Sequence, residues 1–80
     1  MKEFYQMTRE EFLPIGIEIG KKSSPEQPES FYVRQANRNH YNVVRRFIES
    51  GELTQEQAEA IGHFKDYPEL KGRNVSNENN

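Results

Sequence analysis

Apolar residues recur at helical spacing through the second half of the chain. From about residue 33 to residue 49 they fall on one face of a helix that Gly51 would end, because glycine is favoured just past a helix C-terminus. That face comprises Val33, Ala36, His40, Val43, Val44 and Phe47. A second, shorter apolar stripe follows from about residue 55 to residue 64, and the short link between the two helices predicts an αα-hairpin.

Two helix starts carry the same capping pattern. Thr8 precedes Glu11 by three residues, and Thr54 precedes Gln57 in the same way, which is the spacing of a capping box. Pro14 disfavours helical geometry in the residue before it and removes a backbone donor. We therefore expect the N-terminal helix to be short.

The segment between these helices has a different period. In IGIEIG, residues 15–20, isoleucine alternates with glycine or glutamate, which is the period of a β-strand. The only candidate partner is the brief FYV at residues 31–33, so the segment is either one strand of a short β-ribbon or an irregular packed stretch. Between them, KKSSPEQPES is rich in Ser, Pro and charge and predicts a mobile loop over about residues 20–30.

Aromatic and apolar residues gather once more in HFKDYPEL, residues 63–70, just before a polar tail. Phe64 should complete the apolar stripe of the preceding helix. Pro68 should turn the chain out of helical geometry near Tyr67. We expect Tyr67 or Leu70 to fold back onto the hairpin and close it.

Composition limits the fold to one small domain. The chain has 80 residues, of which 32% are hydrophobic, so its core is small and a partner or a second copy could be needed to complete it. The pattern predicts a mainly α-helical domain over residues 1–71 and a disordered tail over residues 72–80. The absence of cysteine, of an apolar leader and of a membrane-length apolar run favours a cytoplasmic protein.

Charge is unevenly distributed, although the net charge is only −2. Residues 32–48 contain four arginines and no acid, whereas residues 49–69 contain six acids and one lysine. On a helical wheel one stripe beside the apolar face carries Arg34, Arg38, Tyr41 and Arg45. This stripe is the candidate site for a protein partner or for nucleic acid.

Two interpretations of the stripe remain open. The arginines could neutralise phosphates while Tyr41 stacks on a base, as in proteins that bind single strands. Alternatively, they form ion pairs with nearby glutamates. Those glutamates are Glu49, Glu52, Glu56 and Glu59.

No pattern indicates catalysis, a metal or a cofactor. A metal site needs a third clustered ligand, and His40 and His63 have none in sequence, so we expect both to be core or half-buried side chains. No serine lies in a nucleophile elbow, and no glycine run resembles a phosphate-binding loop. An enzyme is therefore the least favoured class.

The phrases MTREEF and HYNVVRRFIESGELTQEQAEAIGHFKDYPEL resemble a small helical module of phage and plasmid proteins, including the polyvalent proteins of mobile elements. Those modules open with a Met-Thr-x-x-Glu-Phe-like phrase and finish near Asp-Tyr-Pro-(Asp/Glu)-Leu. The matching positions are His40, Val43, Val44, Ile48, Gly51, Leu53, Glu56, Asp66, Tyr67, Pro68, Glu69 and Leu70. This chain departs from the pattern by LTQEQ in place of Val-Pro-x-Glu and by extra residues, including IGHF, before DYPEL.

The resemblance implies a phage or mobile-element setting and a helical fold, and it implies no reaction. Small phage proteins commonly act by docking on a host or phage assembly. We therefore expect a protein-interaction module that docks on a partner through the stripe of Arg34, Arg38, Tyr41 and Arg45. Weak nucleic-acid binding through the same stripe is the alternative.

Overall fold

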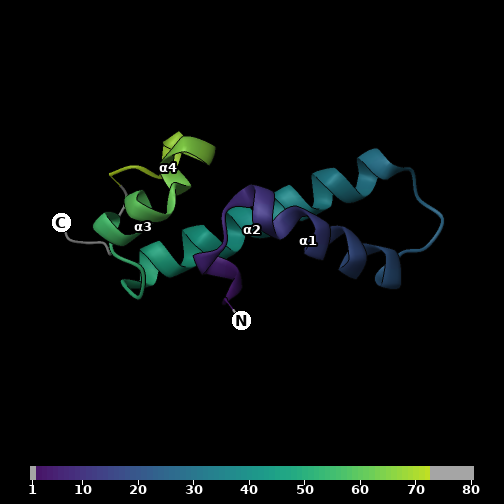
Figure 1. Cartoon of the computed structure of the whole chain (residues 1–80), viewed down its shortest axis with the longest axis horizontal. Helices are drawn as coiled ribbons and strands as arrows, with labels where there is room; N and C mark the ends of the chain where they lie inside the picture. The colour runs from purple at the N-terminus through teal and green to yellow at the C-terminus, as the bar shows by residue number, and fades with distance from the viewer. Residues whose placement is uncertain (1, 73–80) are drawn as a thin grey trace.

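The computed structural model describes residues 2–72 and confirms a mainly α-helical fold, with no β-strand in that range. In chain order the elements are η1 (Phe4–Gln6), α1 (Arg9–Ser23), α2 (Glu29–Ser50), α3 (Gln55–Ile61), α4 (His63–Asp66) and η2 (Pro68–Leu70). Helices α1 and α2 lie side by side and antiparallel, and α3 and α4 gather near the C-terminal end of α2 (Figure 1). No helix of the described part has the length and apolar character needed to cross a bilayer.

Helix α1 is longer than predicted, because Pro14 lies inside it and does not end it. The predicted capping box is present: the Glu11 amide donates to Thr8 Oγ1 at 3.1 Å, and the Thr8 amide donates to Glu11 Oε1 at 3.0 Å. The missing donor of Pro14 would have bonded the carbonyl of Glu10, four residues earlier. Both residues are exposed, so water can satisfy that carbonyl and the helix continues.

Neither alternative for residues 15–20, a β-ribbon or an irregular stretch, is present, since IGIEIG forms the middle of α1 and FYV forms the first turns of α2. The buried positions of α1 are Phe12, Gly16 and Gly20, spaced by four residues. In α2 the buried positions are also four residues apart. They are Tyr32, Ala36, His40, Val44 and Ile48. The isoleucines of α1 flank the buried stripe, and Ile19 is 45% exposed.

The two stripes bring the helix backbones very close together. A Cβ atom on Gly16 would lie only 2.5 Å from Ala36 Cβ, so glycine and alanine at this crossing permit a separation that larger residues would prevent. Interlocking of ridges spaced by four residues on both helices is a common mode of helix packing. A strand at this position would have no described partner, whereas the helix buries its glycine seam against α2.

The connection between α1 and α2 is shorter than the predicted loop, because α1 continues to Ser23 and α2 begins at Glu29. Tyr32, buried in the first turns of α2, holds this connection. Its hydroxyl donates to the Ser24 carbonyl and accepts from the Gln27 amide, the latter at 3.1 Å.

Helix α2 ends as predicted, with Gly51 in the left-handed conformation at φ 86°. Thr54 then caps α3 through the predicted capping box. The predicted second helix, residues 55–64, is divided in two, because Gly62 adopts φ 107° between α3 and α4. Both predicted helices are therefore present. Helix α2, however, packs more extensively on α1 than on the helix that follows it.

The segment HFKDYPEL closes the core as predicted. Tyr67 leaves helical geometry before Pro68, and Tyr67 and Leu70 are 5% and 0% exposed. They complete an apolar cluster that also contains Val44, Ile48, Leu53 and Ala58, against which Phe64 packs. A second apolar cluster, Met7, Phe12 and Ala36, lies between α1 and α2. The predicted disordered tail, residues 72–80, lies outside the described residues except for Gly72.

Candidate functional site

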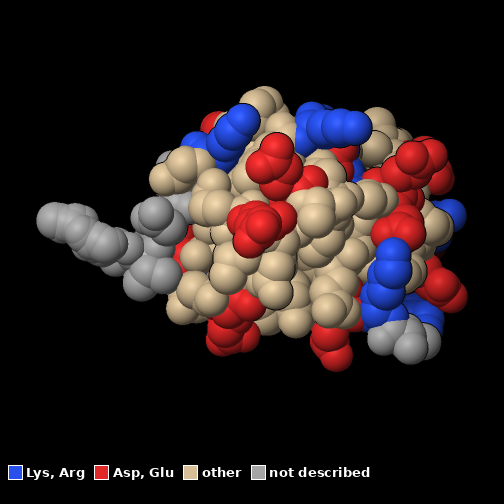
Figure 2. Space-filling view, turned by 60° about the vertical axis from the view of Figure 1, so that its left-hand side comes forward, with Lys and Arg blue, Asp and Glu red and all other residues tan. Residues whose placement is uncertain are grey.

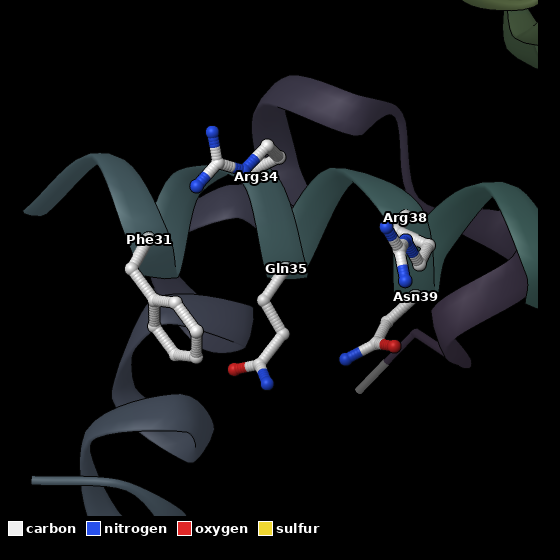
Figure 3. A pocket seen from close by; sticks show the side chains of 5 residues that line it. All are labelled: Phe31, Arg34, Gln35, Arg38 and Asn39. Carbon is white, nitrogen blue, oxygen red and sulfur yellow. The ribbon is translucent and has the colours of Figure 1, made fainter. Parts of the chain in front are cut away.

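Two of the four residues of the predicted site lie together at an open hollow on α2. Arg34 and Arg38 line it with Phe31, Gln35 and Asn39, and its volume is about 230 Å³. Figure 3 shows Phe31, Gln35 and Asn39 projecting from one side of α2, with Arg34 and Arg38 placed along the helix above them. We call this set of five residues the arginine hollow.

The local sequence explains this arrangement. Arg34 and Arg38 are four positions apart, so both lie on one stripe of α2 with about 6 Å between their Cα atoms along the axis. Both side chains belong to exposed residues, and neither forms an ion pair with another residue of the described range. The hollow therefore offers two guanidinium groups, two amides and one half-buried aromatic ring to a ligand.

The other two residues of the predicted site have different roles. Tyr41 is half-buried against the core, and its ring meets the Tyr67 ring edge to face at a centroid distance of 5.3 Å. Arg45 Nη1 lies 3.4 Å from Glu49 Oε1, one turn farther along the same helix. The ion-pair interpretation thus describes Arg45, whereas Arg34 and Arg38 keep their charges directed to the surface.

A second group of polar residues lies at the centre of the domain, where the sequence indicated only isolated side chains. His40 and His63 are both 0% exposed, as expected of core histidines, and their ring centroids are 5.6 Å apart. Tyr67 joins them, with its hydroxyl 2.7 Å from His40 Nδ1. We call these three residues the histidine cluster.

Backbone carbonyls of the N-terminal segment define the tautomers of the cluster. His40 Nε2 donates to the Met7 carbonyl at 2.8 Å, so Nδ1 accepts from the Tyr67 hydroxyl. His63 Nε2 donates to the Tyr5 carbonyl at 2.7 Å. His63 Nδ1 is buried without a hydrogen-bond partner among the described residues. The two bonds to carbonyls fit neutral rings, the form that burial favours, and they tie the N-terminal segment to α2 and α4.

Burial is the main electrostatic influence on the cluster. It lowers the pKa of His40 below the ordinary value of 6.5; the hydrogen bond to the Met7 carbonyl opposes this effect and the nearby His63 adds to it. Burial likewise lowers the pKa of His63, against the hydrogen bond to Tyr5. It raises the pKa of Tyr67 to about 12, so the hydroxyl keeps its proton.

Asp66 and Arg9 complete the surroundings of the cluster. Asp66 Oδ2 accepts from the Arg9 amide at 3.1 Å, and the Arg9 guanidinium carbon lies 5.7 Å from the centre of the Tyr67 ring. Three grouped residues of the kinds that hold a metal ion do not occur within residues 2–72. The three residues of the cluster are buried, and their hydrogen bonds join the N-terminal segment, α2 and the chain after α4.

The sequence contained a partial signal for the cluster. His63 and Tyr67 are four residues apart, which is the spacing of neighbours on one helix face. Nothing in the sequence indicates the contacts to the Met7 and Tyr5 carbonyls, because these depend on where the N-terminal segment crosses α2. The glutamine and asparagine of the arginine hollow were also missed, since uncharged amides produce no charge pattern.

Fold and geometry together define a small helical domain with an open arginine-lined hollow on its longest helix and neutral histidines at its centre. Comparisons of the chain with models of known protein families, with curated proteins and with solved structures found no match. The resemblance to modules of phage and plasmid proteins stays a prediction.

Proposed function

We propose that this protein is a protein-interaction module of a phage or another mobile element and that it docks on an acidic segment of a host or phage protein through the arginine hollow. The observation that carries the proposal is the exposure of Arg34 and Arg38 beside Phe31, without a carboxylate of the described range to neutralise them. The mobile-element setting rests on the resemblance of MTREEF and DYPEL to the helical modules.

The chemistry of the hollow favours a carboxylate-bearing peptide. Guanidinium groups bind carboxylates through two parallel hydrogen bonds, and the amides of Gln35 and Asn39 can pair with a peptide backbone. Phe31 adds an apolar surface, and aromatic residues with arginine are the usual anchors of protein interfaces.

The same geometry argues against nucleic acid as the main ligand. Tyr41 packs on Tyr67 and Arg45 pairs with Glu49, so two residues of the stripe, one of them a cation, have partners within the fold. Two phosphate contacts would give a salt slope of only about −2 in log–log form, which corresponds to weak binding. The net charge of −2 weakens it further.

Fluorescence anisotropy distinguishes the two ligand classes. The probes are a labelled peptide rich in Glu and Asp with one aromatic residue, and single- and double-stranded DNA of similar length, each titrated at low and moderate salt. We expect the peptide to bind more tightly than either DNA. The double variant Arg34→Glu/Arg38→Glu should weaken peptide binding at least tenfold.

The matched control is Arg46→Glu, an exposed arginine of the same helix that does not line the hollow. It should change peptide binding less than threefold. Tighter binding to DNA, lost in the double variant, would replace the proposal with the nucleic-acid alternative. Peptide binding that is equal in all variants would remove the arginine hollow as the docking surface.

A further inference from the structure

A second hollow, with the opposite charge, lies at the other end of α2. Its volume is about 270 Å³, and it is lined by Tyr5, Gln6, Glu52, Leu53, Gln57, Ala60 and Ile61. Four of these seven residues are apolar or aromatic, and Glu52 is the one carboxylate among them. We call this set the acidic hollow.

Glu52 lines the acidic hollow, and further glutamates lie near it in the sequence. Residues 47–64 contain four glutamates and no lysine or arginine, and Glu56 is exposed one turn before Ala60. Figure 2, which brings the α3–α4 end forward, shows carboxylates spaced over a largely uncharged surface, with lysine and arginine toward its margins. An occupant that complements this surface combines an apolar side chain with positive charge.

Fixed side chains form the walls of the acidic hollow. The Tyr5 ring stacks on Phe47 at a centroid distance of 4.1 Å, and the Tyr5 carbonyl accepts the hydrogen bond from His63. Leu53, at its base, is 3% exposed. Binding would therefore require little ordering of the walls, which lowers the entropic cost of association.

The chain itself carries the complementary surface. The arginine hollow places Phe31 beside Arg34 and Arg38, so it combines an apolar ring with two positive charges. We propose that the arginine hollow of one copy docks on the acidic hollow of a second copy, so that the protein self-associates head to tail. This inference rests on the proposed function, because one of its two surfaces is the arginine hollow.

The position of the two hollows excludes contact between them within one chain. Sixteen residues of α2 separate Arg34 from Ser50, which corresponds to about 24 Å of helix. Each copy would then use one hollow for the preceding neighbour and the other for the following one. Such a contact between unlike surfaces produces a ring if the rotation between neighbours closes, and an open chain if it does not.

Sedimentation velocity over a concentration series tests the inference with the intact protein. A contact this small should be weak, with a dissociation constant on the order of 10⁻⁴ M, and it should weaken at least tenfold between about 0.02 M and 0.5 M salt as screening increases. The variants Arg34→Gln/Arg38→Gln and Glu52→Gln/Glu56→Gln should each abolish it. The control Glu18→Gln/Arg46→Gln, at exposed positions outside both hollows, should not.

Mixing the two deficient variants gives the sharpest result. One variant keeps an intact acidic hollow and the other an intact arginine hollow, so an equimolar mixture can form one native contact and should stop at dimers. With the first variant labelled with ¹⁵N, the amide shifts of Leu53 and Ile61 should move and those of Phe31 and Asn39 should not. Circular dichroism confirms that both variants are folded.

Other outcomes overturn the inference. A wild-type chain that stays monomeric at about 1 mM in low salt, or a mixture that stays monomeric, excludes head-to-tail docking. If the mixture stays monomeric while Glu52→Gln/Glu56→Gln still binds the acidic peptide through Arg34 and Arg38, the proposed function stands and only self-association fails. If no variant binds that peptide but the mixture forms dimers, the arginine hollow binds copies of this chain, and the proposal of a foreign acidic partner is wrong.

Discussion

The close crossing of α1 and α2 makes a specific prediction for Gly16. In an unpacked helix interior, Gly→Ala stabilises by up to about 1 kcal/mol, because alanine loses less backbone entropy. Here the new Cβ would lie 2.5 Å from Ala36 Cβ, 2.8 Å from Phe12 Cε2 and 3.1 Å from Ala36 Cα. We therefore expect Gly16→Ala to destabilise the fold.

The magnitude follows from which atoms must move. Carbon atoms in contact prefer separations of about 3.5–4.0 Å, and the Ala36 Cβ is attached rigidly to the backbone of α2. Relief consequently requires the two helices to separate, and overpacking of this kind costs typically about 1–3 kcal/mol. After subtraction of the gain in helix propensity, the net loss is about 1–2 kcal/mol, or roughly 4–15 °C in Tm for a domain of this size.

Gly20 provides the matched control on the same helix. A Cβ there would meet Gln35 Oε1 at 2.6 Å and Tyr32 Cδ1 at 3.0 Å. The Gln35 tip can rotate away and the tyrosine ring needs to move only slightly, so Gly20→Ala should leave the free energy of unfolding within about 0.5 kcal/mol of wild type.

Urea and thermal unfolding followed by circular dichroism at 222 nm measure both changes. A double-mutant cycle with Ala36→Gly should show that part of the Gly16→Ala cost disappears when the Ala36 methyl group is absent. If Gly16→Ala is as stable as wild type, or if the cycle shows no coupling, the helices do not cross at these residues and the reasoning is wrong.

Two further predictions concern the core. Burial lowers the pKa of His40 and His63, so the free energy of unfolding should have its full value above pH 6.5. As the pH decreases below 6.5, this free energy should decrease by up to about 2.7 kcal/mol per pH unit for the two histidines together. Equal urea midpoints at about pH 7.5 and 5.5 would contradict this. Leu70 is 0% exposed, so Leu70→Ala should cost about 2–4 kcal/mol, whereas Ile19→Ala at a 45% exposed position should cost much less. Thermal melts compare these two variants, and similar Tm values would show that Leu70 does not close the core.

Local sequence signals were sufficient to predict features that form within one helix turn. The capping boxes at Thr8 and Thr54 and the glycine end of α2 were predicted from the sequence and are present in the fold. Each depends on residues at most three positions apart or on the backbone freedom of one glycine. Such signals do not depend on the rest of the chain.

The error at residues 15–20 arose because two periods coexist there. The isoleucines alternate as in a strand, whereas Phe12, Gly16 and Gly20 recur every four residues and match Ala36 on α2. Hydrophobicity alone gives weight to the isoleucines and none to glycine. The helix prevails because its glycine seam permits close backbone packing, which becomes evident only once the opposite helix is known.

The candidate site was predicted in part for a related reason. A helical wheel correctly grouped Arg34, Arg38, Tyr41 and Arg45 on one stripe, but it could not show which side chains would find partners in the fold. The Tyr41 ring packs against the ring of Tyr67, which lies 26 residues farther along the chain. A helical wheel could not predict the acidic hollow, because Tyr5, which forms part of its wall, comes from the N-terminal segment.

The histidine cluster lies at the boundary between the two halves of the core. On α2, His40 stands one turn after Ala36 of one apolar cluster and one turn before Val44 of the other. Its two hydrogen bonds, to Met7 and Tyr67, are directional, so they define the register in which the N-terminal segment and α4 meet α2 in a way that apolar contacts would not. The arginine hollow lies on the half formed by α1 and α2, and the acidic hollow lies on the half that α3 completes. Tyr5, bonded to His63 through its carbonyl, also forms a wall of the acidic hollow, so loss of the neutral histidines should loosen this hollow first.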